Sequence, residues 1–151
     1  MKGNDINILL KDRYSTLGEI GKGAFGKVYK VLDTQTNTYL AVKRLNREEI
    51  ERSDYLHKAY SKELLVMKEI ESEYSVKLIE HFTSSNNFNI VMELCDGDLE
   101  QWNNSYKGYI SENQLKEILS GLNNVFLIMD QKNIVHRDLK LKNVLITLKK
   151  N

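Results

Sequence analysis

Two clusters of residues in this sequence of 151 residues have the composition and spacing to bind phosphate groups. The first contains Gly21, Gly23 and Gly26 in a G-x-G-x-x-G pattern, and a cation, Lys43, ends an apolar run further along the chain. Glycine lets a backbone approach a phosphate closely, and a lysine supplies the opposite charge. The second cluster, residues 136–143, contains a histidine, an aspartate, an asparagine and three basic side chains.

The glycine pattern by itself fits more than one kind of structure. In dinucleotide-binding folds it precedes a helix whose N-terminus faces a pyrophosphate. In a hairpin that covers a nucleotide, a strand follows instead, and a valine stands two positions after the last glycine. Here residues 27–31, Lys-Val-Tyr-Lys-Val, continue as a strand, and Val28 is that valine. The sequence therefore favours a hairpin that covers a nucleotide over the dinucleotide-binding fold of an oxidoreductase. An ordinary glycine-rich hairpin that binds no ligand is the remaining alternative.

Lys43 needs a fixed position if it is to hold phosphates. Side chains alternate along a strand, so Ala41 and Lys43 share one face, where the small alanine admits an adenine ring and the lysine reaches the phosphates. An anion from a neighbouring element can fix the lysine, and Glu63, in the middle of the next predicted helix, is the candidate. Two alternatives stay open: a strand-end lysine can be an ordinary surface charge, and Glu63 can pair with Lys58 or Lys62 of its own helix.

The second cluster identifies a resemblance. Residues His136 to Asn143 match the pattern H-R-D-x-K-x-x-N at all five specified positions. With the glycine pattern and the Ala-Val-Lys strand before it, this makes the sequence resemble eukaryotic-type protein kinases from Tyr14 to Leu148. The resemblance implies an α+β, protein-kinase-like fold. It has a five-stranded antiparallel sheet with one αC-type helix in the N-terminal lobe, followed by the first helices of an incomplete helical C-terminal lobe.

The resemblance also implies a reaction and its residues. The expected activity is transfer of a phosphoryl group from ATP, with Mg²⁺, to a serine or threonine hydroxyl of a protein substrate. Asp138 is expected to orient that hydroxyl and accept its proton, and Lys140 to neutralise charge on the transferred group. Asn143 is expected to give an oxygen to Mg²⁺, while Lys43, held by Glu63, binds the phosphates. The lysine two positions after the aspartate is typical of serine/threonine kinases.

The remaining nucleotide contacts also follow from the resemblance. The residues expected to cover the nucleotide from the N-terminal lobe are Ile20, Gly21, Gly23, Gly26, Val28, Ala41 and Lys43. Met92 resembles the gatekeeper, Glu93 and Cys95 are expected to offer backbone hydrogen bonds to adenine, Asp98 to meet the ribose, and Leu145 to form the floor.

Periodicity predicts the elements that position these residues. Alternating apolar residues predict three strands between Tyr14 and Leu45, and a three- to five-residue spacing predicts one amphipathic helix from about Asn46 to Ser72. The later predictions are strands over 76–82, 88–94 and 144–148 and helices over 99–106 and 111–130, the last with a capping box. The predicted domains are an N-terminal extension, 1–13, an N-terminal lobe, 14–95, and a partial C-terminal lobe, 96–151.

Composition restricts partners and location. The net charge of +1 provides no field that attracts nucleic acid or an anionic membrane. The single cysteine, Cys95, excludes an internal disulfide, and no apolar stretch is long enough to span a bilayer. We therefore expect a soluble, intracellular, cytoplasmic protein whose partners are ATP and a protein substrate, with no nucleic-acid or membrane partner.

The sequence departs from the kinase pattern in two places. Leu141 replaces a proline that is common in this loop, and no Asp-Phe-Gly follows the strand predicted over 144–148. We therefore expect impaired catalysis by this chain and an exposed apolar face on the helix over 111–130, which leads either to poor solubility or to association with another polypeptide. The alternative function is an inactive, truncated kinase-like protein that binds nucleotide or acts as a scaffold.

Overall fold

The computed structural model describes residues 9–23, 26–105 and 110–148. The chain forms two compact units, one of residues Met1–Leu65 with Lys77–Leu94 and the other of Val66–Val76 with Cys95–Asn151. The first eight residues of the predicted extension, and Tyr106 at the end of a predicted helix, lie outside the described residues. The predicted lobe bounds stay a prediction.

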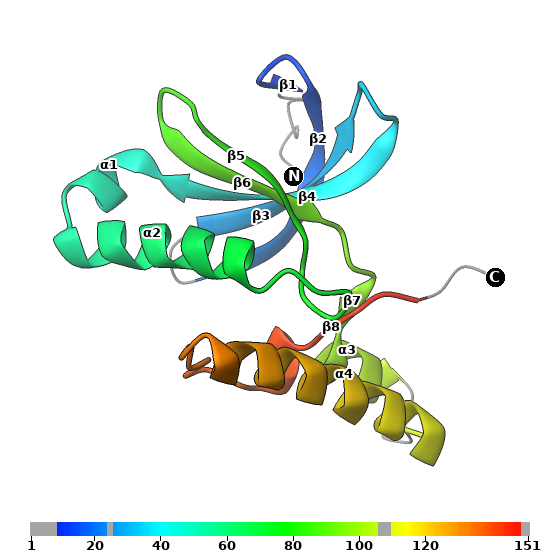
Figure 1. Ribbon diagram of the computed structural model, residues 1–151. Coiled ribbons are helices and arrows are strands. Elements are labelled where there is room, and N and C mark those ends of the chain that lie inside the picture. The colour runs from blue at the N-terminus through cyan, green and yellow to red at the C-terminus, as the bar shows by residue number, and fades with distance from the viewer. Residues whose placement is uncertain (1–8, 24–25, 106–109, 149–151) are drawn as a thin grey trace. The chain divides into compact units, whose positions relative to one another are not determined.

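An antiparallel sheet forms the first unit, in the strand order β1-β2-β3-β4-β6-β5 (Figure 1). The strands are β1 (Leu9–Leu10), β2 (Tyr14–Gly23), β3 (Gly26–Asp33), β4 (Thr38–Asn46), β5 (Leu78–Thr83) and β6 (Asn87–Glu93). The sheet thus has six strands, and the prediction of five was wrong by one short edge strand. A turn with positive φ at Lys11 and Asp12 folds β1 back onto β2, which buries Leu10 to 6% exposure.

The two faces of the sheet carry different residues. One face holds the hydrophobic core of this unit, whose buried members are Leu10, Tyr14, Val31, Leu40, Val42 and Val91, with Tyr29 and Phe82 packed against them. Residues directly opposite on neighbouring strands share a face. Val28 lies opposite Lys43, and Ala41 lies opposite Met92, so these four residues point to the other face.

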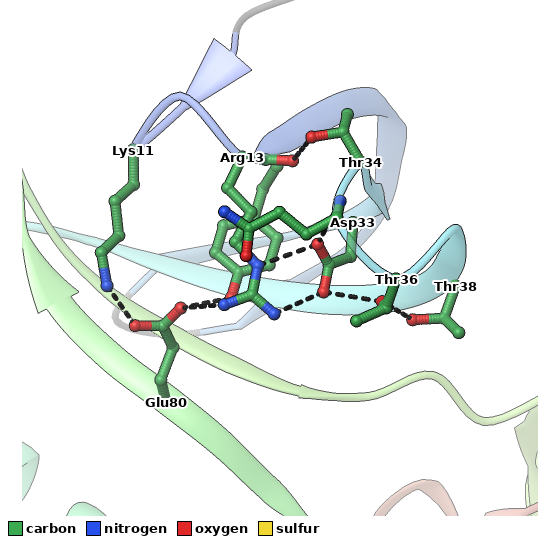
Figure 2. A network of polar contacts seen from close by, with 9 residues as sticks. Lys11, Arg13, Asp33, Thr34, Thr36, Thr38 and Glu80 are labelled. Carbon is green, nitrogen blue, oxygen red and sulfur yellow. Dashed lines mark hydrogen bonds and ion pairs between the residues drawn. The ribbon is translucent and has the colours of Figure 1, made fainter.

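A polar network closes the core face near β1 (Figure 2). The Arg13 guanidinium donates to both carboxylate oxygens of Asp33, at 2.8 and 2.6 Å, and Asp33 is only 1% exposed. Lys11 and the Tyr14 hydroxyl both donate to Glu80 of β5. The pKa of Asp33 lies well below its usual range, chiefly because of the Arg13 hydrogen bonds. The network ties the start of β2 to the end of β3 and to β5.

Two helices replace the single helix predicted from about Asn46 to Ser72: α1 (Arg47–Glu51) and α2 (Asp54–Glu69). The Asn46 side chain caps α1 by accepting from the Glu49 amide. The Ser53 hydroxyl accepts from the Leu56 amide at 3.3 Å, so a second N-terminal cap interrupts the helix that the apolar spacing predicts. Tyr60 of α2 stacks on Phe88 of β6 with ring centroids 4.7 Å apart, which holds α2 against the sheet.

The second unit is mostly helical. It contains α3 (Leu99–Ser105), α4 (Glu112–Gln131), a 3-10 turn (η1, Leu141–Asn143) and two short paired strands, β7 (Gly97–Asp98) and β8 (Leu145–Ile146). Both halves of the predicted Ser111–Gln114 capping box are formed. Gly121 of α4 is buried against Tyr74, whose ring would lie 2.8 Å from an added Cβ. Among the described residues, no helix has both the length and the apolar character to cross a membrane.

Candidate active site

Lys43 of β4 and Glu63 of α2 form an ion pair. The Lys43 Nζ donates to both Glu63 carboxylate oxygens, at 2.6 and 2.8 Å, and the side chains are 22% and 37% exposed. Of the described residues, neither Lys58 nor Lys62 forms an ion pair with Glu63, so the alternative pairing on its own helix is absent there. The structure therefore fixes one partly exposed cation on a central strand, three residues before the strand ends.

Three of the residues expected around the adenine, Val28, Ala41 and Met92, lie on the same sheet face as Lys43. Val28 is its direct neighbour on β3, Ala41 is 5% exposed, and Met92 stands opposite Ala41. Ile20 of β2 is 51% exposed, so its side chain is free to cover a ligand. Lys30, opposite Ala41 on β3, also points to this face, and its apolar surface comes from Val28, Ala41 and Met92.

The three glycines belong to the β2–β3 hairpin, and a strand follows the last of them, as predicted. Only Gly26 is in a crowded place. A Cβ there would overlap the carbonyl oxygen of Arg44 and lie 3.3 Å from the Leu45 Cα, whereas the nearest atoms to a Cβ at Gly21 or Gly23 are 3.8 Å away. Gly26 is therefore required for close packing of β3 against β4. Sequence reasoning missed Arg44, and nothing in the pattern of strand residues marks it.

Glu93, which is expected to contact the adenine through its backbone, is the last residue of β6 and bonds to Lys77. Its amide donates to the Lys77 carbonyl at 3.0 Å, and its carboxylate accepts from the Lys77 amide at 2.9 Å. In the second unit, Cys95 is half-buried, and Asp98 of β7 accepts from the Gln101 amide at 2.9 Å as a cap of α3. Leu145, 44% exposed, lies opposite Asp98 on β8. Asp98 thus has a structural partner, which leaves its other oxygen for a ligand.

The loop over 136–143 gathers its polar residues around Asp138. The Lys140 Nζ donates to both Asp138 carboxylate oxygens, at 3.0 and 2.8 Å. The Asn143 amide nitrogen donates to the carbonyl and to Oδ2 of Asp138, at 2.7 and 3.0 Å. The Lys140 hydrogen bonds, followed by the Asn143 hydrogen bond, lower the pKa of Asp138. Asp138 is therefore an ionised, exposed carboxylate held in one orientation at neutral pH.

The backbone contributes to this orientation. Arg137, which precedes Asp138, has a φ of 66°, in the region that non-glycine residues rarely adopt. The Asp138 amide donates to the His136 Nδ1 at 3.3 Å, so His136 braces the turn. Strained backbone of this kind is frequent where a side chain must be aimed at a ligand.

The donor set of the loop also bears on metal binding. No group of three or more histidine, cysteine, aspartate or glutamate side chains in the described part of the chain could hold a metal ion. Mg²⁺ commonly takes only one or two protein ligands and completes its shell with water and substrate phosphates. Because the Asn143 amide nitrogen is engaged by Asp138, its Oδ1 is the atom that fits such an ion.

The sequence that carries these residues matches a known family. The protein kinase domain family model matches residues 14–151. The chain belongs to the protein kinase domain family. The kinase domain is 33% identical over 137 residues to serine/threonine-protein kinase 33 of Mus musculus. The aligned segment covers 89% of this chain and 27% of the relative.

Two further relatives show how broadly this kinase domain matches the family. It is 30% identical to cell division control protein 2 homolog 1 of Trypanosoma brucei brucei, over 91% of this chain and 45% of the relative. It is 34% identical to testis-specific serine/threonine-protein kinase 4 of Homo sapiens, over 84% of this chain and 38% of the relative. The chain thus spans less than half the length of each of these relatives.

Proposed function

We propose that this chain binds ATP with Mg²⁺ and transfers the γ-phosphoryl group to a serine or threonine hydroxyl of a protein. The observation that carries the proposal is the Lys43–Glu63 ion pair, because a cation held by an anion from another element is ready to neutralise phosphate charge without reorganisation. Val28, Ala41 and Met92 on the same face supply apolar surface for the adenine.

Asp138 is the proposed acceptor for the substrate proton. In the reaction the hydroxyl oxygen forms a bond to the γ-phosphorus, the bond from that phosphorus to the bridging oxygen of ADP breaks, and the hydroxyl proton moves to the Asp138 carboxylate. A carboxylate whose pKa is lowered by Lys140 is a weak base, so its main task is to orient the hydroxyl until the transition state. The hydrogen bonds of Lys140 to Asp138 support its proposed role, which is to neutralise the developing charge.

Mg²⁺ neutralises phosphate charge when it is bound, and Asn143 Oδ1 is its proposed ligand in this chain. The proposed serine/threonine specificity draws support from Lys140 in the loop and from the names of the relatives. The remaining expected contacts, from Ile20, Gly21, Gly23, Gly26, Glu93, Cys95, Asp98 and Leu145, are part of the same proposal. Association with another polypeptide through α4 stays a prediction, which Leu115, Leu119 and Leu127 support by being 46%, 55% and 53% exposed.

The experiment that tests the nucleotide site is thermal unfolding of the chain with and without Mg-ATP. A ligand that binds only the folded state raises the melting temperature, by an amount that grows with its concentration. We expect a rise for the parent chain and for Lys62→Met, an exposed lysine on α2 beside Glu63, and none for Lys43→Met. An equal rise in Lys43→Met, or no rise in a folded parent chain, would refute the proposal.

Phosphate transfer is tested separately with a mixed serine/threonine peptide library and γ-labelled ATP. Incorporation of label that Asp138→Asn abolishes supports the kinase. Nucleotide binding without any incorporation supports the alternative of a kinase-like binding module.

A further inference from the structure

A pocket lies in the first unit, on the core face of the sheet and near the glycine hairpin. Its volume is about 410 Å³, and its lining includes Lys22, Lys27, Tyr29, Arg44, Asn46 and Glu49. Lys27 directly precedes Val28, and Arg44 directly follows Lys43. Because side chains alternate along a strand, Lys27 and Arg44 point to the opposite face of the sheet from the proposed ATP site. The basic side chains of this pocket therefore point away from Lys43, although Gly23 and Gly26 of the proposed nucleotide site also line the pocket.

Three of the lining residues form a row of like charges. Lys22 lies directly opposite Lys27, and Lys27 lies directly opposite Arg44, on three neighbouring strands. Side chains in such positions are about 5 Å apart at Cβ, and like charges there destabilise a sheet. Lys27 has a carboxylate partner, with its Nζ 2.7 Å from Glu19, whereas no carboxylate of the described residues pairs with Lys22 or Arg44. The sheet thus carries uncompensated positive charge at one place.

The Arg44 side chain is held in place. Its guanidinium lies over the Tyr29 ring, 5.6 Å from the centroid, and its Nε is buried without a hydrogen-bond partner among the described residues. A buried donor left unpaired costs free energy, and a stacked guanidinium has little conformational freedom left to lose when it binds an anion. Arginine presents a planar fork of donors that fits the oxygens of a phosphate.

The other lining groups limit what the pocket can accept. Asn46 uses its Oδ1 to cap α1, which leaves its amide nitrogen as a donor, while Glu49 adds one negative charge. The net charge of the chain is only +1, which provides no overall field that attracts a polyanion or a membrane. The volume lies within the range of about 300–1,000 Å³ that is usual for sites of small ligands. The pocket suits a single doubly charged group.

We propose that this pocket binds a phosphate monoester, carried on a phosphorylated serine or threonine of a polypeptide. The phosphate chemistry rests on Lys22, Lys27 and Arg44 alone. The choice of a phosphorylated side chain as its source rests on the proposed function, because a serine/threonine kinase makes that group.

The test is titration of the uniformly ¹⁵N-labelled chain with an acetylated Gly-Ala-phosphoserine-Ala-Gly peptide, its unphosphorylated form and inorganic phosphate. Arginine Nε–H signals are visible in such spectra, so Arg44 reports directly. We expect saturable shifts at Arg44 and Lys27 with the phosphopeptide and none with the unphosphorylated peptide. Inorganic phosphate is expected to bind more weakly; equal affinity would show that free phosphate is the ligand and overturn the polypeptide source. No saturable shift with either phosphate would overturn the site.

Variants on the two sheet faces separate this proposal from the proposed function. Arg44→Met and Lys22→Met are expected to weaken phosphopeptide binding about tenfold or more, as expected for loss of a charge-assisted hydrogen bond. Lys30→Met, a lysine of β3 on the other face, is expected to have no effect. Lys22 is exposed, so its variant stays informative if Arg44→Met is unstable. Lys43→Met is expected to lose Mg-ATP binding and keep phosphopeptide binding. Unchanged phosphopeptide binding in both basic variants, or its loss in Lys43→Met, would overturn the site.

Discussion

The three glycines of the hairpin are expected to respond very differently to alanine. An alanine methyl group at Gly26 would overlap the Arg44 carbonyl oxygen and lie 3.1 Å from its carbon and 3.3 Å from the Leu45 Cα. Carbon atoms pack best at about 3.5–4.0 Å, so even these two contacts are too short, and they are to backbone that cannot rotate away. To admit the methyl group, β3 must move away from β4 at the Lys27–Arg44 pair.

The magnitude follows from the overlap. Overpacking of this kind costs about 1–3 kcal/mol, and weakening a ladder hydrogen bond adds roughly 1 kcal/mol. We therefore expect Gly26→Ala to lower the free energy of unfolding by about 2–4 kcal/mol, which is a fall of ~10 °C or more in melting temperature for a unit of this size. Gly21→Ala and Gly23→Ala, whose nearest atoms are 3.8 Å from the added Cβ, are the matched controls. They are expected to be neutral or slightly more stable, because alanine has less freedom than glycine in the unfolded chain.

The assay is thermal unfolding followed by far-UV circular dichroism, with hydrogen exchange to locate the change. Amides of β3 and β4 near residues 27 and 44 should exchange faster in Gly26→Ala and at the parent rate in the two controls. If Gly26→Ala melts together with Gly21→Ala and Gly23→Ala, the β3–β4 register at Arg44 is wrong.

Three further predictions concern individual polar groups. Asp33→Asn is expected to lower the free energy of unfolding by about 2–3 kcal/mol near neutral pH. Because folding lowers the pKa of Asp33, its contribution to stability is complete above the ordinary carboxyl pKa and is lost as the pH falls. The free energies of urea unfolding of parent and variant should therefore converge in acid. Ser111→Ala removes the N-cap of α4 and should cost about 1 kcal/mol in the same assay; an unchanged midpoint would contradict the capping box. Lys140→Met should raise the pKa of Asp138 toward its ordinary value, measured by the ¹³C shift of the carboxyl carbon, whereas Lys142→Met should leave it unchanged.

Much of the fold is local in origin and could therefore be predicted. The α4 helix has an apolar stripe, a serine at its N-cap and a glutamine three residues later, and all three signals agree. The strands β2, β3 and β4 alternate apolar and polar residues between turns rich in glycine, asparagine and threonine. The Lys43–Glu63 pair could be proposed because the family pattern names a lysine on a strand and a glutamate on the next helix, and the structure brings the two together.

The features that could not be predicted depend on local capping that interrupts a helical pattern, on a very short strand, and on the register between strands. The apolar spacing from Asn46 to Ser72 continues through Ser53, whereas in the structure α1 ends in a C-cap at Arg52 and the Ser53 hydroxyl accepts from the Leu56 amide as a new N-cap. A two-residue strand such as β1 is too short for any periodicity, and its position depends on positive φ angles in the turn that follows. The Lys22–Lys27–Arg44 row could not be predicted from the sequence, because strand register, and not spacing along the chain, places those residues together.

The central claim, that Lys43 contacts the phosphates of a bound nucleotide, is open to direct chemical measurement. In an acyl phosphate derivative of ATP, the reactive carbonyl sits at the end of the triphosphate and acylates a lysine amine beside it. With Mg²⁺ present, peptide mass spectrometry should find the acyl group on Lys43, and excess Mg-ATP should suppress it. Acylation confined to exposed lysines such as Lys58 and Lys62, at a rate that Mg-ATP does not change, would contradict the nucleotide site.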